Sequence, residues 1–429
     1  MNHIHRKLYP LASIAAGVVT LAAALPASAI DLTNADGTWK FSLNGNVNVD
    51  YIYSNCESAS SAKTITAGLA CTGNASGNSV SNIGNGLLPA AFAFGVSTTQ
   101  AGIDLAAHLG LFPGIATNDG GSPNLQASGG PTNTGLGTTG LDLRQVYMTF
   151  GNKDMGTFTL GRNFGLFGFD AIINDMTLIG VGVAGSASGP TPANTTLGSI
   201  GFGYIYVDTL AQMDYTTPDF SGANLTVGIF DPLNSLTEPG APAAKSAPGF
   251  HAKIAWSGKF GDDMKLSLSA TGIEQKQDYL TGTTAGSFQS VGGDVFAKLD
   301  LGGLSLMASG YDGKGMGTTG LFFNADDGHG NGRESYGYLL QGTYTVAQVK
   351  FGVNYGVSRL AYANAADRVA VGNLLADNSK WTGGVYYSLT KNLTLLGEVS
   401  YVDTFAHNES LNGAENKSTN FNVGAFLAF

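Results

Sequence analysis

The chain has 429 residues, a formal net charge of −10 and only 12% charged residues, which is about half the share of an ordinary soluble protein. So few charges disfavour a soluble domain, and the negative sign excludes a nucleic-acid-binding surface, which needs a basic face. The 62 glycines disfavour long helices. A β-barrel in lipid fits this composition, because its outer band excludes charge while its interior stays polar.

Residues 1–29 have the pattern of a secretory signal peptide. Arg6 and Lys7 belong to a basic start, an apolar stretch follows, and small residues precede a cleavage site after Ala29. The apolar stretch is too short for a membrane-spanning helix. Cleavage removes Arg6 and Lys7, so the net charge changes from −10 to −12. We therefore expect an exported protein with a single domain over residues 30–429.

The two cysteines, Cys56 and Cys71, lie in one stretch rich in Ser, Ala, Gly and Asn. An exported chain crosses an oxidising compartment, so we expect a disulfide between them. Two free thiols are the alternative. A metal site is disfavoured, because two cysteines without nearby histidines supply too few ligands.

From Trp39 onward, segments of about ten residues alternate apolar and polar side chains and then break at a turn or a loop. In the first segment Phe41 and Val47 share one parity, whereas Asn46 and Asn48 share the other. A period of two places the two sets on opposite faces of a strand. The segment is long for a soluble strand and sufficient for a tilted membrane strand.

The breaks between segments alternate between short turns and long connections. This layout predicts sixteen strands, and short turns on one side with long loops on the other are typical of bacterial outer-membrane barrels. The long connections are 54–87, 118–140, 164–206, 233–248, 278–287, 312–334, 361–378 and 405–418, and the short turns lie near Gln100, Asn152, Pro218, Gly261, Gly302, Ala347 and Lys391.

The last segment alternates Phe421, Val423, Ala425, Leu427 and Phe429 with small or polar residues, and the given sequence ends on Phe429. It resembles the C-terminal strand of outer-membrane barrels. The resemblance implies that the assembly machinery reads the terminal aromatic residue.

Residues 144–170 resemble the Gram-negative trimeric porins. A strand opening with Arg144 leads to a short turn, a second strand ends in Gly161-Arg162-Asn163, and a long connection begins at Phe164. In that family the third outer loop folds into the barrel and narrows it. The resemblance implies an all-β transmembrane barrel in the bacterial outer membrane, a homotrimer, and passive diffusion of ions and small hydrophilic solutes.

The connection 164–206 is too apolar for a solvated loop, so we expect it to pack against the inner wall as a constriction loop. By resemblance, Asp170 and Asp175 would face basic side chains across the constriction, where a transverse field orients solutes. The alternative is that both acids cap a helical turn or anchor the loop. We expect Arg144 on the basic side, and Arg162 at the start of the loop or in a subunit contact.

Other charged residues have the parity of the lumen. They are Lys40, Asp50, Lys253, Lys298 and Lys350.

The chain departs from enteric general porins, which carry basic residues where this sequence has Asn46 and Ala91. An anion-selective pore would need a lysine-rich constriction, which the sequence does not reveal. The net charge therefore predicts a weak preference for cations.

The main prediction is a general diffusion porin, in contact with membrane lipid and not an enzyme. The chain has no nucleophile elbow and no phosphate-binding loop, and we expect no cofactor and no metal. The segment 326–332 resembles a calcium turn but lacks the spacing of an EF-hand, and we interpret it as part of an outer loop. The alternatives are a substrate-selective porin and, from a different class, an outer-membrane adhesin or receptor barrel.

Overall fold

The computed structural model describes residues 30–57, 65–71, 79–115, 141–184, 194–234, 241–243, 245–281, 283–407 and 414–429. The predicted signal peptide lies outside the described residues, and so does the predicted connection 118–140.

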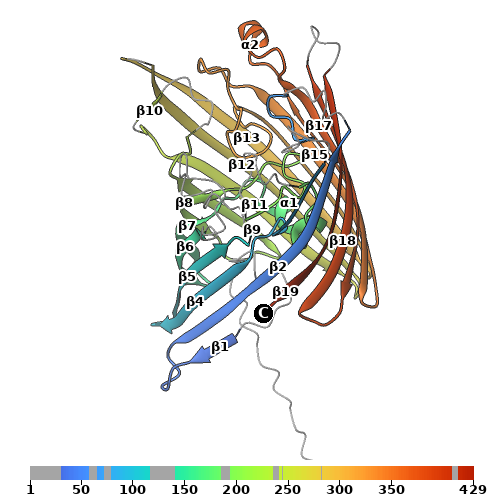
Figure 1. Cartoon of the computed structure of the whole chain (residues 1–429). Coiled ribbons are helices and arrows are strands. Elements are labelled where there is room, and N and C mark those ends of the chain that lie inside the picture. Colours follow the sequence, from blue (N-terminus) through green and yellow to red (C-terminus); the bar gives the residue numbers. More distant parts are fainter. Residues whose placement is uncertain are drawn as a thin grey trace, which may run out of the picture.

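Within the described residues, sixteen antiparallel strands form the wall of a closed barrel (Figure 1), as the sequence predicted. Each strand pairs with its neighbour in chain order, and β19 pairs with β2 to close the ring. The strands are β2 (Lys40–Cys56), β4 (Ala91–Gln100), β5 (Ile103–Pro113), β6 (Leu141–Asn152), β7 (Gly156–Phe164), β8 (Thr209–Thr216), β9 (Ala223–Phe230), β11 (Gly249–Phe260), β12 (Met264–Thr281), β13 (Thr284–Leu301), β14 (Leu304–Lys314), β15 (Glu334–Val346), β16 (Val349–Leu360), β17 (Leu375–Ser388), β18 (Leu393–Ala406) and β19 (Glu415–Ala428).

Three short strands that the sequence did not predict extend this wall. β1 (Ile30–Thr33) pairs with the first residues of β2, and β3 (Ser79–Gly84) pairs with its last third. β10 (Ala241–Pro242) pairs with β12 near Leu280. All three lie at the ends of long wall strands, where they satisfy backbone groups that the neighbouring wall strand leaves free.

The alternation of β2 shows which face of the wall meets lipid. Val49 and Tyr51 are 42% and 43% exposed, whereas the intervening Asn48 and Asp50 are 1% and 0% exposed. A soluble protein would bury the apolar set, because apolar surface in water is costly. Here the apolar set points outward on every wall strand, so its solvent is hydrocarbon and the polar set faces the lumen.

The predicted connection 278–287 is wrong in extent, because it is a tight hairpin. β12 continues to Thr281 and β13 begins at Thr284, with the two strands paired along their whole length. Charged residues on the outer face, such as Glu274 and Lys276, interrupt the apolar pattern there. Strands that project beyond the hydrocarbon meet water on their outer face, so the alternation that marks a membrane strand is lost although the pairing continues.

Turns and loops lie at opposite ends of the barrel. In Figure 1 the C-terminus and β1 are at the lower end, and helix α2 (Ala365–Ala370) is at the upper end. Asn364 caps α2, because its side chain accepts hydrogen bonds from the backbone of Ala366 and Asp367. Among the described residues, no helix has the length and apolar character needed to cross a bilayer.

The first long connection is tied to the barrel by the predicted disulfide, which is confirmed between Cys56 and Cys71. Between these cysteines the backbone N–H of Ala70 donates to the hydroxyl of Thr404 at 3.0 Å. Leu69 packs into the hydrophobic cluster inside the barrel. The described residues 65–71 of this loop therefore lie on the inner side of the wall.

The terminal residue closes the lower end of the sheet. The backbone N–H of Phe429 donates to the carbonyl of Gly45 at 3.0 Å, and the N–H of Gly45 donates back at 2.8 Å. The Phe429 ring lies 5.6 Å from that of Phe92. Its role as an assembly signal stays a prediction.

Removal of the disulfide gives a first test. The variant Cys56→Ser with Cys71→Ser is expected to lose about 3 kcal/mol of unfolding free energy, because the bridge constrains a short loop in the unfolded chain. Urea denaturation of the folded barrel in detergent, followed by tryptophan fluorescence, measures this. The wild-type protein after reduction is the control and should show the same loss. An unchanged midpoint in both would contradict the prediction.

Candidate functional site

The described parts of the third long connection, residues 165–184 and 194–208, lie in the lumen. It contains helix α1 (Phe169–Asn174) and the 3-10 helix η4 (Met176–Ile179). Gly168 precedes α1 with a φ of 76°, a left-handed conformation that glycine adopts without strain. Most apolar side chains of the segment are buried in one cluster with inward-facing residues of the wall, and the others, such as Phe167 and Val181, belong to two smaller clusters. The predicted packing of this connection against the inner wall is therefore seen in its contacts.

Glu398 on β18 holds the segment after η4. Its carboxylate accepts hydrogen bonds from the backbone N–H groups of Val181 and Gly182 at 2.9 and 2.8 Å. The hydroxyl of Tyr386 donates to the other carboxylate oxygen at 2.6 Å. Glu398 is only 2% exposed, so all three groups donate their hydrogen bonds to one buried carboxylate.

Lys380 on β17 holds the segment that returns across the lumen. Its ammonium group donates to the carbonyl of Gly198 at 2.8 Å and to the hydroxyl of Ser199 at 2.7 Å. Asn354 on β16 also donates to the Ser199 hydroxyl, at 3.2 Å. Two neighbouring wall strands thus form hydrogen bonds to the same bend of the connection.

Gln341 on β15 holds the junction between α1 and η4 from both sides. Its amide donates to the carbonyl of Asn174 at 2.8 Å, and its oxygen accepts from the N–H of Met176 at 2.7 Å. Farther along the connection, the N–H of Gly203 donates to the hydroxyl of Ser358 at 2.9 Å. Backbone groups that would be unsatisfied in the lumen are paired with the wall.

Asp170 lies at the start of α1 against the wall. Its carboxylate is 2.6 Å from the ammonium group of Lys253 on β11 and accepts from the hydroxyl of Ser269 on β12 at 2.5 Å. The neighbouring N–H of Gly168 donates to Asp294 on β13 at 2.8 Å. The side chain of Asp170 is 18% exposed, so it keeps some contact with the lumen.

Asp175 is placed differently, because it is 3% exposed and braces the connection from within. It caps η4 through the N–H of Thr177 at 3.0 Å, and it accepts from the N–H of Ser199 at 3.0 Å and the hydroxyl of Tyr204 at 2.8 Å. Burial and the Asp175 charge raise the pKa of Tyr204, which therefore stays protonated and donates. This geometry favours the anchoring alternative for Asp175.

Arg144 on β6 is 7% exposed and contacts the connection at Asn194. Its guanidinium group lies 3.0 Å from the carboxylate of Asp142 and donates to the side-chain oxygen of Asn194 at 3.2 Å. It also lies 5.5 Å from the centre of the Phe112 ring. These contacts leave it little surface toward the lumen.

Arg162 lies on β7 in register with Val146 and Ala211, which are exposed on the outer face. It attracts Asp208 at the end of the third connection electrostatically. The position fits both predicted roles, a loop anchor and a subunit contact.

Asn46, where enteric general porins carry a basic residue, is 0% exposed in this chain. Its amide donates to the carbonyl of Pro89 at 2.9 Å, and Asn48 donates to that of Leu88 at 2.8 Å. The backbone of Leu87 in turn donates to Gly180 of the third connection at 2.7 Å. The segment before β4 therefore lies over this part of the wall.

The four remaining predicted lumen charges each have a different environment. Asp50 is buried, with the amide of Asn422 at 3.4 Å. Lys298 on β13 is 3.5 Å from Asp300, and Lys350 on β16 lies 4.4 Å from the centre of the Tyr386 ring. Lys40 is exposed at the lower end of β2.

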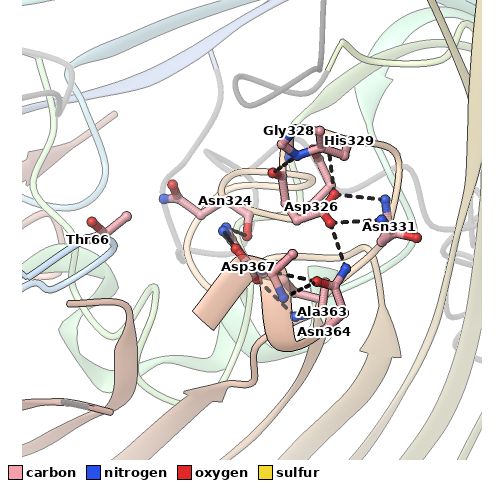
Figure 2. A network of polar contacts seen from close by, with 12 residues as sticks. Thr66, Asn324, Asp326, Gly328, His329, Asn331, Ala363, Asn364 and Asp367 are labelled. Carbon is pink, nitrogen blue, oxygen red and sulfur yellow. Dashed lines mark hydrogen bonds and ion pairs between the residues drawn. The ribbon is translucent and has the colours of Figure 1, made fainter. Parts of the chain in front are cut away.

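The segment 326–332 belongs to a polar network at the outer end of the barrel (Figure 2). The Asp327 carboxylate accepts from the backbone N–H groups of His329 and Asn331 at 2.8 and 3.0 Å, and from the amide of Asn364 at 2.8 Å. Its oxygens are occupied by N–H donors rather than arranged for a cation. Nowhere in the described ranges do three or more His, Cys, Asp or Glu residues gather as a metal site.

A buried ion pair completes that network. Arg333 and Asp367 are each 2% exposed, and their side chains approach to 2.6 Å. The N–H of Ala363 donates to the same carboxylate at 2.9 Å. Arg333 ends the connection after β14 and Asp367 lies in α2, so the ion pair joins two outer loops to each other.

Glu398, Lys380 and Gln341 were not predicted as functional residues. Their parity marks them as inward-facing, as polar residues between apolar ones on their strands. Their partners are backbone groups more than 150 positions away in the chain. Parity therefore identifies their face of the wall, but no local pattern indicates that they hold the loop.

The family model described as Gram-negative porin matches residues 12–407 of the chain. No curated protein matches the chain in sequence. Among solved structures, the outer membrane channel DcaP of Acinetobacter baumannii is 14% identical with a TM-score of 0.64, and the alignment covers 93% of this chain and 99% of that one.

Two further solved structures share the fold. OmpF of Salmonella typhi, in complex with daunomycin, is 12% identical with a TM-score of 0.53. The alignment covers 93% of this chain and 100% of that one. OprB of Pseudomonas putida is 13% identical with a TM-score of 0.53, covering 92% and 95%. Identities this low support a shared barrel and carry no information on solutes.

Loss of the Glu398 anchor is expected to loosen the third connection. In Glu398→Ala, two buried N–H groups lose their acceptor, at a cost of about 1–3 kcal/mol each. Single-channel recordings should then show larger and noisier current steps. Glu398→Gln keeps an oxygen acceptor and should behave nearly as wild type, and Asp403→Asn on the same strand is the matched control. Identical currents in Glu398→Ala and wild type would show that the anchor does not limit the passage.

Proposed function

The chain belongs to the Gram-negative porin family, and we propose that it is a general diffusion porin through which ions and small hydrophilic solutes pass passively. Members of the family are outer-membrane β-barrel channels and not enzymes. The solute range and selectivity proposed here rest on the residues of this chain.

One observation carries the proposal: a connection inside the lumen is fastened to the wall on several sides. The anchors lie on seven wall strands. They are Arg144 on β6, Lys253 on β11, Asp294 on β13, Gln341 on β15, Ser358 on β16, Lys380 on β17 and Glu398 on β18. A sixteen-stranded barrel encloses an aqueous channel, and an inserted segment narrows it to a size filter. A fixed filter with polar surroundings discriminates by size and charge and needs no conformational cycle.

We propose a weak preference for cations. The mature chain carries a net charge of −12, calculated from −10 by removal of Arg6 and Lys7. In addition, among the described residues the hydrogen bonds to Asp175 and Glu398 come from neutral N–H and O–H donors. Fixed negative charge beside a narrow passage raises the local concentration of cations.

A homotrimer is proposed from the family. The outward faces of the first strands carry exposed apolar side chains such as Phe94 and Leu109, which suit a contact with lipid or with a second copy. Single-channel records should then show steps in threes.

Recordings in planar bilayers test the channel and its charge preference together. We expect ohmic current steps. In a salt gradient the reversal potential should have the sign that indicates a preference for cations. Asp170→Asn should lower the cation preference, by less than about fivefold, because it removes one partly exposed charge and frees Lys253. Asp214→Asn, a buried lumen acid paired with His251, is the control. Silent bilayers with folded, inserted protein would overturn the channel function, and an unchanged reversal potential in Asp170→Asn would remove Asp170 from the selectivity filter.

A further inference from the structure

The connection between β14 and β15, residues 315–333, packs inside the barrel, and we call it the wedge. Four of its apolar residues are at most 1% exposed. They belong to one buried cluster with Phe167 and Ile205 of the third connection and with inward-facing residues of the wall. The four are Met316, Leu321, Phe322 and Ala325, and the wall residues are Leu210 on β8, Phe230 on β9, Ile273 on β12 and Tyr311 on β14. A solvated outer loop would not bury these side chains.

The wedge lies on the returning limb of the third connection, which we define as residues 198–206. The backbone N–H of Tyr206 donates to the carbonyl of Thr319 at 2.7 Å, and Tyr206 forms an isolated β-bridge with Gly320. The side chain of Thr319 also lies against Gly201, whose φ of 80° suits a residue without a side chain. The two connections are therefore joined through their backbones.

The barrel wall holds the same limb by other groups. Lys380 on β17 donates to the carbonyl of Gly198 at 2.8 Å, and the N–H of Gly203 donates to Ser358 on β16 at 2.9 Å. The returning limb thus has hydrogen bonds to the wall and to the wedge. Its position depends on both of them.

Arg333 fastens the wedge at its end. Its Nε and Nη2 atoms donate to the two carboxylate oxygens of Asp367 at 2.8 and 2.6 Å, and Nη1 donates to the carbonyl of Asn324 at 3.1 Å. The backbone N–H of Arg333 donates to Ala325 at 2.7 Å, and its carbonyl accepts from Gly315 at 2.8 Å. One residue therefore closes the wedge on itself and ties it to α2.

A buried ion pair at this place is better explained by geometry than by stability. Apolar residues of similar volume often stabilise a protein as well as a buried ion pair does. A bidentate arginine–carboxylate pair adds a fixed orientation of the two partners. Such an orientation matters if the wedge has to stay in one position on the returning limb.

We propose that Arg333 is a positioning residue of the filter. Through the wedge it holds the returning limb of the third connection, and it thereby sets the width of the passage. The proposal rests on the channel function and adds a control point to it, at a residue with almost no exposed surface. A change at the outer loops should therefore alter the current through the lumen.

Single-channel recordings of Arg333 variants test the proposal. In Arg333→Ala the fraction of time spent in wider, noisier states should rise at least about tenfold, because Asp367 is left as an unpaired buried charge. The largest polyethylene glycol that enters the channel and lowers its conductance should also become larger. Arg333→Lys should lie between the two, since lysine lacks the bidentate geometry. The exchanged pair, Arg333→Asp with Asp367→Arg, should restore the wild-type current.

The matched control is Arg359→Ala, which removes an exposed arginine from the outer face of β16. Its current and its polymer cut-off should be those of the wild type. A wild-type current and cut-off in Arg333→Ala would overturn the proposal. If Arg333→Ala does not fold, Asp367→Asn replaces it, because asparagine keeps the shape of the side chain and removes the charge.

A double variant shows whether the wedge acts through the third connection. Arg333→Ala and Glu398→Ala each remove a support of the same connection, so the logarithms of their effects should not add in the combined variant. Additive effects would show that the wedge is a separate barrier, and they would refute the positioning role. Channels that respond to neither Arg333→Ala nor Asp367→Asn would reject this inference alone. Folded, inserted protein without current steps would reject the channel itself.

Discussion

The rest of this structure depends on the satisfaction of backbone hydrogen bonds without water. In hydrocarbon an unpaired N–H or C=O costs several kcal/mol, so a sheet that spans the membrane has to close on itself. Pairing of β19 with β2 does this, and the mutual hydrogen bonds of Phe429 and Gly45 complete the seam at its lower end. Because hydrocarbon surrounds the closed sheet, the usual arrangement of side chains is reversed, with the apolar set outside and the polar set inside.

The same constraint explains why the third connection is anchored by single side chains. A segment without regular structure inside a barrel has backbone groups that need partners, and water supplies few in a narrow passage. Glu398, Lys380 and Gln341 each bind backbone atoms of the connection. These side chains bind the connection and are therefore not available to solutes. The residues that face inward and the residues that contact solutes are different sets.

The sequence predicted the wall well and the lumen poorly, for one physical reason. Strand pairing depends on alternation and on neighbours in the chain, so the sixteen strands and most turns were identified from local patterns. The long hairpin of β12 and β13 was missed where its outer face leaves lipid and the pattern fades. Contacts of the lumen join distant segments, so sequence alone could not separate Asp170, which keeps some exposure, from Asp175, which does not.

Exposure also decides how formal charge should be interpreted in such a protein. A net charge counts every carboxylate equally, yet Glu398 and Asp175 lie behind other side chains while Lys259 and Lys265 face open space. A small inorganic ion responds to the summed field of all of them, because that field extends over about a Debye length. A larger solute that contacts the wall responds mainly to the groups that it touches. The net charge therefore predicts the preference among small inorganic ions, whereas the exposed groups of the wall govern the solutes that contact it.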